Sequence, residues 1–284
     1  MSFSFDRKNF LKAAVTAVVA AGVLAVAACA PTAAVKADPS ALPTITAGKL
    51  TVGTGNPAYE PWVVGDKPES GEGYEAAVAY AVADQLGFKK SDVVWVRTTF
   101  DEAIAPGAKN FDFNLQQYSI TDDRKKSVDF SSPYYETAQT VITVKGSKAA
   151  SAKTIADLKG LTLGAATGTT SFDAIEKVIQ PTAGAQAFNS NDDAKAALSA
   201  GQVDAIVVDL PTALYLTAVE LKGGQIIGQL AGAASGDQFG LVLDKGSKLT
   251  AKVSAAVDAL KANGTLKKLQ DKWLAGYAGA PVLK

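Results

Sequence analysis

Residues 119–135, SITDDRKKSVDFSSPYY, contain an arginine at position 124 that sets this stretch apart. The chain has 28 basic residues, and only Arg7, Arg97 and Arg124 among them are arginines. The other positive charges come from lysine. A guanidinium donates two parallel N–H bonds to the two oxygens of a carboxylate, and lysine cannot reproduce that geometry. Arg124 therefore either holds a carboxylate or lies on the exposed face of a helix.

Two interpretations of the stretch are open from the residues alone. Thr121 suits the N-cap position of a helix, and Asp122 and Asp123 would then lie in its first turn, where carboxylates are favourable. Arg124 would in that case lie on a solvated helix face. Alternatively, Arg124 and the hydroxyls of Ser119 and Thr121 surround a bound carboxylate.

Composition excludes several classes of protein. At 284 residues with 48% hydrophobic content, the chain can bury a large core as one large domain or two lobes. Its 28 basic and 28 acidic residues give a formal net charge of zero, which disfavours nucleic-acid binding. The absence of histidine excludes Ser-His-Asp and Cys-His catalysis and histidine-based metal sites. No cofactor and no metal are expected.

The N-terminal residues predict export. Residues 1–28 place Arg7, Lys8 and Lys12 before an uncharged run that begins at Ala13, as in a signal peptide. The run ends L-A-V-A-A-C, which resembles a bacterial lipobox with Cys29 as the lipidated first residue. A plain signal peptide and a membrane anchor are the alternatives, although the run is shorter than the ~20 residues of a spanning helix. SFDRKNFLK also resembles a twin-arginine signal. Residues 29–47, rich in Ala, Pro and Thr, predict a flexible tether.

From Gly48 onward, strand-like and helix-like segments alternate, which predicts an α/β fold with mostly parallel sheets. Residues 140–148 and 239–248 are apolar strands that both end in Lys-Gly-Ser-Lys. If both strands cross between two lobes, the first lobe comprises residues 48–142, the second lobe residues 143–240, and residues 241–284 return to the first. Chance similarity in a chain rich in Lys and Gly is the alternative.

The order of motifs resembles one family. An S-x-T-x-x-R run at Ser119, a D-F-S-x-P-Y run at Asp129 and a G-T-T turn at Gly168 are typical of the solute-binding proteins of polar amino-acid ABC importers, family 3 type. The similarity covers residues 50–274. It implies a type II periplasmic-binding fold, with two α/β lobes joined by two hinge strands and a ligand-binding cleft that closes. The resemblance also implies an ABC permease partner, and together with the lipobox at Cys29 it predicts a lipid-anchored monomer on the extracellular face of the membrane.

The resemblance assigns roles to individual residues. Arg124 and Ser119 would hold the α-carboxylate of an amino acid, with Thr121 close by, and Thr170 would add its hydroxyl and N–H from the second lobe. Asp209, at the end of a buried strand, would take the α-ammonium. The remaining ligand-binding candidates are Tyr59 and Trp62, which would cover the ligand, Gln116 and Gln117, which would face its amino group and side chain, and Thr169, for which N-capping is the alternative.

The chain also departs from the family pattern. Glu75 and Ala77 replace two aspartates, a change expected to affect the first helix more than the cleft. We expect a neutral ligand with a polar or aromatic side chain. A cationic ligand is the rival, since Glu60 and Glu75 flank the aromatic segment, but Asn56 replaces an early aspartate of the family.

Two other functions remain open. Dehydratases of small carboxylic acids share this fold, and Glu60, Glu75 or Asp209 could then serve as acid or base. A ligand-sensing domain is the third possibility, although no signalling domain follows Lys284.

Overall fold

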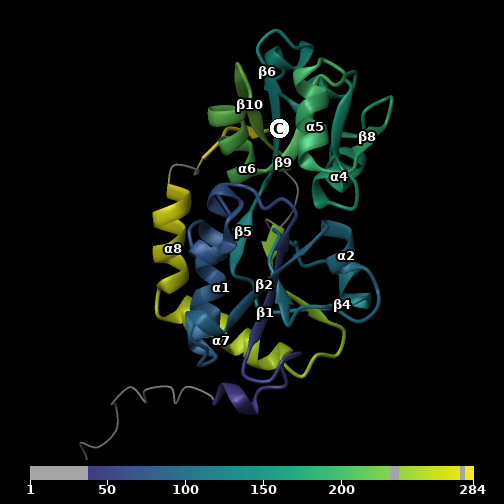
Figure 1. Ribbon diagram of the computed structural model, residues 1–284. Helices are drawn as coiled ribbons and strands as arrows, with labels where there is room; N and C mark the ends of the chain where they lie inside the picture. Colours follow the sequence, from purple (N-terminus) through teal and green to yellow (C-terminus); the bar gives the residue numbers. More distant parts are fainter. Residues whose placement is uncertain (1–37, 231–236, 276–278) are drawn as a thin grey trace, which may run out of the picture. The chain divides into compact units, whose positions relative to one another are not determined.

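The computed structural model describes residues 38–230, 237–275 and 279–284, which belong to one compact unit. The signal segment, Cys29 and most of the expected tether lie outside these residues. Two sheets dominate the described part, and each forms the centre of a lobe (Figure 1). The α/β class and the two lobes agree with the sequence prediction.

The first lobe contains a five-stranded sheet covered by helices. Its strands are, in spatial order, β2 (Val93–Thr98), β1 (Leu50–Gly55), β3 (Phe113–Asn114), β12 (Val242–Asp244) and β4 (Val128–Phe130). Its helices are α1 (Tyr74–Gln85), α2 (Phe100–Ile104), α7 (Thr250–Ala262) and α8 (Thr265–Leu274). Helix α1 packs against α7 and α8, and its buried Val78 and Val82 join the core of this lobe. Every residue of β1 is buried, as expected for a strand with neighbours on both sides.

The second lobe contains a six-stranded sheet. Its strands are, in spatial order, β13 (Val282–Leu283), β10 (Gly224–Leu230), β6 (Gln139–Val144), β9 (Ala205–Asp209), β7 (Leu163–Ala166) and β8 (Ala185–Phe188). Its helices are α3 (Ile155–Leu158), α4 (Thr170–Ala174), α5 (Asn191–Ser199) and α6 (Leu210–Tyr215). Helices α4 and α6 continue into π-helical turns. Both faces of the central strands are buried, and the core residues on them include Val141, Ile206 and Val207.

The crossing between the lobes differs from the prediction. Strands β5 (Tyr135–Thr137) and β11 (Asp237–Phe239) pair antiparallel as a separate two-stranded sheet between the two lobes. The Lys-Gly-Ser-Lys strands do not pair, because β6 lies inside the second sheet and β12 inside the first. Gly146 and Gly246 both have positive φ, at 92° and 75°, so the repeated tetrapeptide encodes the same kind of turn at two strand ends.

Three boundary and topology predictions therefore need correction. The expected boundary at 142/143 would cut β6, all of which belongs to the second sheet. Residues 282–283 also join the second sheet, where β13 pairs with β10, so residues 241–284 do not all return to the first lobe. Both sheets are mixed rather than mostly parallel: β12 is antiparallel to β3 and β4, and β6 to β9 and β10. In the chain, β6 directly follows the hinge strand β5, and β12 directly follows the hinge strand β11. Neither has the long crossover connection that parallel pairing requires.

Aromatic side chains surround the hinge strands. Trp62 meets Tyr135 and Phe239 edge to face, with ring centroids 5.6 Å and 5.8 Å away, and Tyr74 meets Tyr135 at 5.3 Å. Such edge-to-face contacts contribute about 0.5–1.5 kcal/mol each beyond the burial of area. The two hinge strands are therefore packed against rigid aromatic side chains.

Candidate functional site

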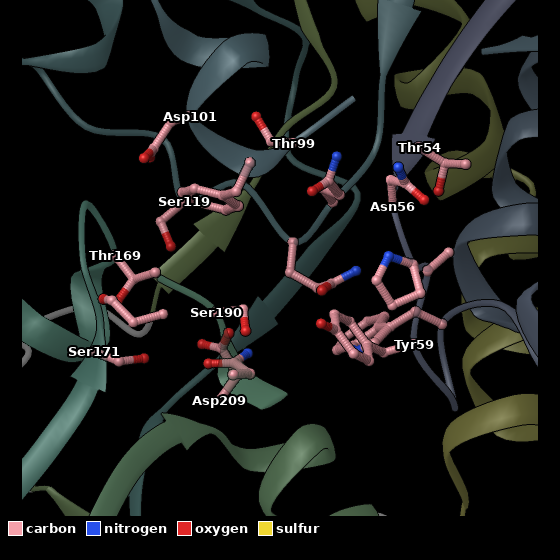
Figure 2. Close-up of a pocket in the computed structure, with 18 of the residues that line it drawn as sticks. Thr54, Asn56, Tyr59, Thr99, Asp101, Ser119, Thr169, Ser171, Ser190 and Asp209 are labelled. Carbon is pink, nitrogen blue, oxygen red and sulfur yellow. The ribbon is translucent and has the colours of Figure 1, made fainter. Parts of the chain in front are cut away.

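A cavity of about 210 Å³ lies among residues of both lobes, and the sequence-predicted residues converge on it. Figure 2 places Ser119, Thr169 and Asp209 toward one side of this cavity and Asn56 and Tyr59 toward the other. Nine of the ten predicted ligand-binding residues line it, namely Tyr59, Trp62, Gln116, Gln117, Ser119, Arg124, Thr169, Thr170 and Asp209. A cavity of this size suits one small molecule.

Arg124 begins a short 3-10 turn, Arg124–Lys126, instead of lying inside an α-helix that starts at Thr121. Thr121 does not line the cavity, and its hydroxyl accepts the main-chain N–H of Arg124 at 3.2 Å. This turn directs the arginine side chain into the cavity wall. Thr121 therefore supports the backbone of Arg124 in this structure.

The guanidinium of Arg124 is held from both lobes. Its Nη1 donates to the main-chain oxygen of Ser119 at 2.7 Å, and its Nη2 to that of Gly168 at 2.9 Å. The Phe100 ring centre lies 5.2 Å from Cζ, a distance at which a cation is attracted to the ring face. Burial lowers the pKa of Arg124, although a guanidinium stays charged in proteins. The N–H groups that remain can bind a carboxylate.

A network of hydroxyl, carboxyl and amide groups lies beside Arg124 on one side of the cavity. The Ser119 and Thr170 hydroxyl oxygens are 3.1 Å apart, and Ser119 donates to Oδ2 of Asp237 at 2.9 Å. Thr170 also donates to Asp237 Oδ2, and Gln139 Nε2 donates to the same oxygen at 2.8 Å. Thr169 caps α4 by accepting the N–H of Phe172 at 3.2 Å. Thr169 thus has a capping role in addition to its place in the lining.

Asp237 and Gln139 are members of this network that sequence reasoning missed. Asp237 opens β11 and pairs with Thr137 of β5, while Gln139 opens β6. The register of the hinge strands brings them to Ser119, which itself forms an isolated bridge with Phe239. In the sequence, the one signal for Asp237 was the presence of a carboxylate close to the apolar strand at residues 239–243. That signal is weak.

Asp209 ends strand β9 at the cavity, where it accepts a hydrogen bond from Gln139 Nε2 at 2.9 Å. Burial, followed by the neighbouring charge of Asp237, raises the pKa of Asp209 to about 8. The site therefore holds two carboxyl groups close together beside one guanidinium. A ligand cation placed at Asp209 would restore its ordinary ionisation.

The two predicted aromatic residues occupy different environments. Trp62 is 0% exposed, and its indole N–H donates to the Thr212 hydroxyl of the second lobe at 3.1 Å. Most of its surface therefore belongs to the core, although it also contributes to the cavity lining. Tyr59 is half-buried at the cavity wall, and burial raises its pKa well above the ordinary range.

Glu75 corrects a sequence-based expectation: it lines the cavity, whereas the change at this position was expected to affect the first helix more than the cleft. Its side chain is 2% exposed and accepts hydrogen bonds from the Tyr134 hydroxyl, the Gln117 main-chain N–H and Gln117 Nε2. Burial raises the pKa of Glu75 to about 7, against the lowering effect of these donors. Gln116 lies beside it, with Nε2 donating to the Thr98 hydroxyl at 3.1 Å.

Metal chemistry and membrane spanning find no support among the residues that the structure describes. Within these ranges no group of three or more Cys, Asp or Glu side chains could hold a metal ion. Over the same residues, no helix has the length and apolar character needed to cross a bilayer.

The bacterial extracellular solute-binding proteins, family 3, match residues 50–276, and the chain belongs to this family. It is 34% identical over 241 residues to the L-arginine-binding protein of Pseudomonas aeruginosa, a match that covers 82% of this chain and 90% of that protein. The ABC transporter glutamine-binding protein GlnH of Bacillus subtilis is 31% identical over 213 residues, covering 73% and 75%.

A solved structure, an ancestral arginine-binding protein bound to arginine, has a TM-score of 0.66 and 34% identity, covering 80% of this chain and 98% of that one. The family resemblance and the type II periplasmic-binding fold inferred from the sequence are confirmed. Family members are extracellular solute-binding proteins, and the relatives named above are amino-acid-binding proteins by name.

Proposed function

We propose that the chain binds one α-amino acid outside the membrane and delivers it to an ABC importer permease. The observation that carries the proposal is the placement of a guanidinium, Arg124, and a carboxyl group, Asp209, in one small cavity. These groups complement the two charged ends of a zwitterion. The curated relatives, whose names include arginine- and glutamine-binding proteins, support an amino acid as the ligand class.

In the proposed complex, Arg124 holds the α-carboxylate through the N–H groups that Ser119 and Gly168 leave free. The main-chain N–H of Thr170 adds a further donor, and the hydroxyls of Ser119 and Thr170, which donate to Asp237 in this structure, turn to the carboxylate when the ligand binds. Asp209 accepts from the α-ammonium, and the ring of Tyr59 covers the ligand. Because Ser119 and Arg124 belong to the first lobe and Thr170 and Asp209 to the second, one amino acid bridges both lobes.

Closure of the cleft on the ligand is the proposed mechanism of delivery. The hinge is the antiparallel pair β5 and β11, since these are the strands that link the two large sheets. A ligand that contacts both lobes favours the closed arrangement by its differential affinity for it. Small-angle scattering with and without saturating ligand measures this, and an unchanged radius of gyration would remove closure from the mechanism.

For the ligand's side chain we propose a neutral polar or aromatic group, with a cationic one as the rival. No lysine lines the cavity among the residues that the structure describes, and Arg124 is engaged at the carboxylate end, which disfavours an acidic ligand. Glu75 faces the cavity, but three donors already satisfy its carboxylate, so its attraction for a further cation is reduced.

Anchoring through a lipid on Cys29 is part of the proposal and rests on the sequence around that cysteine. The tether of residues 29–47 would then connect the lipid to the first lobe. The protein would act as a monomer on the extracellular face of the cell membrane, where an importer permease lies.

A screen of the common L-amino acids and several small carboxylic acids by thermal shift tests the proposed ligand class. At a concentration ~100 times the dissociation constant, binding adds about 2.7 kcal/mol of stability. For a chain of this size that raises the midpoint by roughly 5–11 °C. A response to carboxylic acids without an amino group, and to no amino acid, would refute the proposal.

A small-carboxylic-acid lyase on the same fold is the second candidate, and one observation favours it. Glu75 and Asp209 line the cavity with pKa values of about 7 and about 8, which suit acid–base chemistry. Prolonged incubation with each ligand that shifts the midpoint, followed by chromatography, separates the two. Recovery of unchanged ligand supports binding for transport, and product that accumulates beyond one equivalent supports the lyase.

A further inference from the structure

Two adjacent glutamines, Gln116 and Gln117, line the cavity between β3 and the Ser119 segment. A carboxamide has one donating end and one accepting end. When the protein engages the donating end, only the carbonyl oxygen is left for a ligand. The orientation of each amide therefore decides which ligand groups it can bind.

The amide of Gln116 is oriented by Thr98. Its Nε2 donates to the Thr98 hydroxyl at 3.1 Å and approaches the Thr98 main-chain oxygen at 3.4 Å. A main-chain oxygen can only accept, so the nitrogen end must face it. Asn114, which is fully buried, donates to the same hydroxyl oxygen from the core side at 2.9 Å. Within the described chain, Gln116 Oε1 has no partner and is left for a bound molecule.

The amide of Gln117 is oriented by Glu75. The main-chain N–H of Gln117 donates to Glu75 Oε1 at 2.8 Å, and its Nε2 donates to Oε2. The hydroxyl of Tyr134 donates to Oε1 as well, which fixes the buried carboxylate. Gln117 has a φ of 52°, a left-handed conformation that is unusual for glutamine and is held by this double contact. Its Oε1 has no partner among the residues described.

We propose that Gln116 and Gln117 present two fixed carbonyl oxygens that accept N–H groups from the side chain of the bound amino acid. The protein then selects a side chain that ends in an N–H donor, a carboxamide or a guanidinium, and rejects carboxylate and apolar ends of similar length. Glu75 is a positioning residue that keeps Gln117 in the accepting orientation. This inference rests on the proposed binding of an amino acid.

Asn56, a third amide in the lining, does not impose this selection. It is exposed and has no side-chain hydrogen bond within the described chain, so its amide can rotate to suit a donor or an acceptor. A site whose buried groups cannot rotate leaves them unpaired when the wrong ligand enters, and such sites discriminate strongly.

Calorimetric titration of the purified protein with four L-amino acids of similar reach tests the selection. We expect glutamine or arginine, whichever binds more tightly, to exceed both glutamate and methionine in affinity by at least roughly tenfold. Glutamate or methionine within threefold of that ligand would overturn the inference while leaving amino-acid binding intact. If no amino acid binds at all, the proposed function itself fails.

Two variants test whether Gln116 and Gln117 cause the selection. Gln116→Met and Gln117→Met keep the side-chain length but remove the carbonyl. Each substitution should lower the affinity for the preferred ligand roughly tenfold, whereas the affinity for methionine should not fall. An equal loss for every amino acid would mean that the glutamines face the common α-ammonium, which contradicts the inference. Gln202→Met, at an exposed position away from the cavity, is the matched control and should leave all affinities unchanged.

Glu75→Gln tests the positioning role. The main-chain N–H of Gln117 can only donate, so a glutamine at 75 keeps its oxygen toward that N–H and turns its NH2 to the Gln117 side chain, which must then accept with its carbonyl oxygen instead of presenting it to the ligand. The ratio of glutamine affinity to glutamate affinity should fall toward one, even where circular dichroism shows the variant to be folded. A folded variant that keeps the wild-type ratio would show that Glu75 has a purely structural role. If the variant does not fold, the two Met variants still decide the main inference.

Discussion

Arg124 donates from Nη2 to the main-chain oxygen of Gly168 at 2.9 Å, which links the first lobe to the loop before α4 in the second. The same guanidinium contacts its own lobe through the Ser119 oxygen. Its orientation is therefore fixed in the arrangement in which the two lobes are in contact. Preorganised donors of this kind lose little side-chain entropy on binding, which favours affinity.

Replacement of Arg124 by lysine should weaken binding of the amino acid by about 2–3 kcal/mol, because lysine keeps the charge but loses the fork of parallel donors. The unfolding midpoint without ligand should fall only slightly, since two hydrogen bonds to main-chain oxygens are lost. Calorimetric titration and a thermal melt measure the two effects separately. An affinity within threefold of wild type would exclude Arg124 as the carboxylate-binding residue, and Lys268→Arg on the exposed face of α8 is the control.

Binding should strengthen as pH rises from about 6 toward 8. In the ligand-free protein the pKa of Asp209 is raised to about 8, so this group is largely protonated at neutral pH. A bound α-ammonium favours the carboxylate, lowers that pKa and expels the proton. Titrations in buffers of different ionisation enthalpy should therefore detect proton release at pH 7. The Asp209→Asn variant should bind the amino acid weakly at every pH and release no proton on binding. If the affinity of the wild-type protein does not change between pH 6 and 8, the proposed role of Asp209 is contradicted.

The ligand-free protein should become less stable as pH rises from about 5 to 7. Burial raises the pKa of Glu75 from 4.5 in the unfolded chain to about 7 in the folded protein, so unfolding releases a proton within this window. The stabilisation that comes from protonated Glu75 is fully present below the pKa of the unfolded chain, 4.5. It is lost as pH rises through the pKa of the folded protein, about 7. The slope should be at most about 1.4 kcal/mol per pH unit for this group.

Urea unfolding of wild type and Glu75→Gln over that pH range measures the contribution of Glu75. The variant should have a shallower dependence, with Asp209 supplying what remains, because the pKa of Asp209 is raised as well. Identical slopes in the two proteins would show that Glu75 does not titrate in this range. Glu136→Gln, at an exposed position of β5, is the control for the loss of one carboxylate.

Replacement of Cys29 by serine should release the protein from the membrane fraction of cells that express the full chain, because serine cannot form the thioether that carries the lipid. Fractionation and immunoblotting measure the distribution. Retention of the serine variant in the membrane would indicate an uncleaved apolar segment instead. A plain, cleaved signal peptide would leave wild type and variant equally free of the membrane.

The sequence alone was sufficient for the α/β class and the two lobes, and it named nine of the residues that line the cavity. Strand and helix periodicities are local, so segments such as β1, α1 and β9 could be predicted from their own residues. The motif around Arg124 also predicted residues that line the cavity, because the residue types required for bidentate donation are few, and the binding of a carboxylate there stays a prediction.

Only the tertiary structure brought Asp237 and Gln139 to Ser119, placed Glu75 against Gln117, and made β5 and β11 the crossing strands. The repeated Lys-Gly-Ser-Lys pattern pointed to the wrong pair of strands. The physical reason is that strand pairing and register depend on contacts between residues about a hundred positions apart, which leave no periodic signal in either segment. The orientation of the two glutamine amides likewise depends on Thr98 and Glu75, which are distant in sequence and adjacent only in the fold.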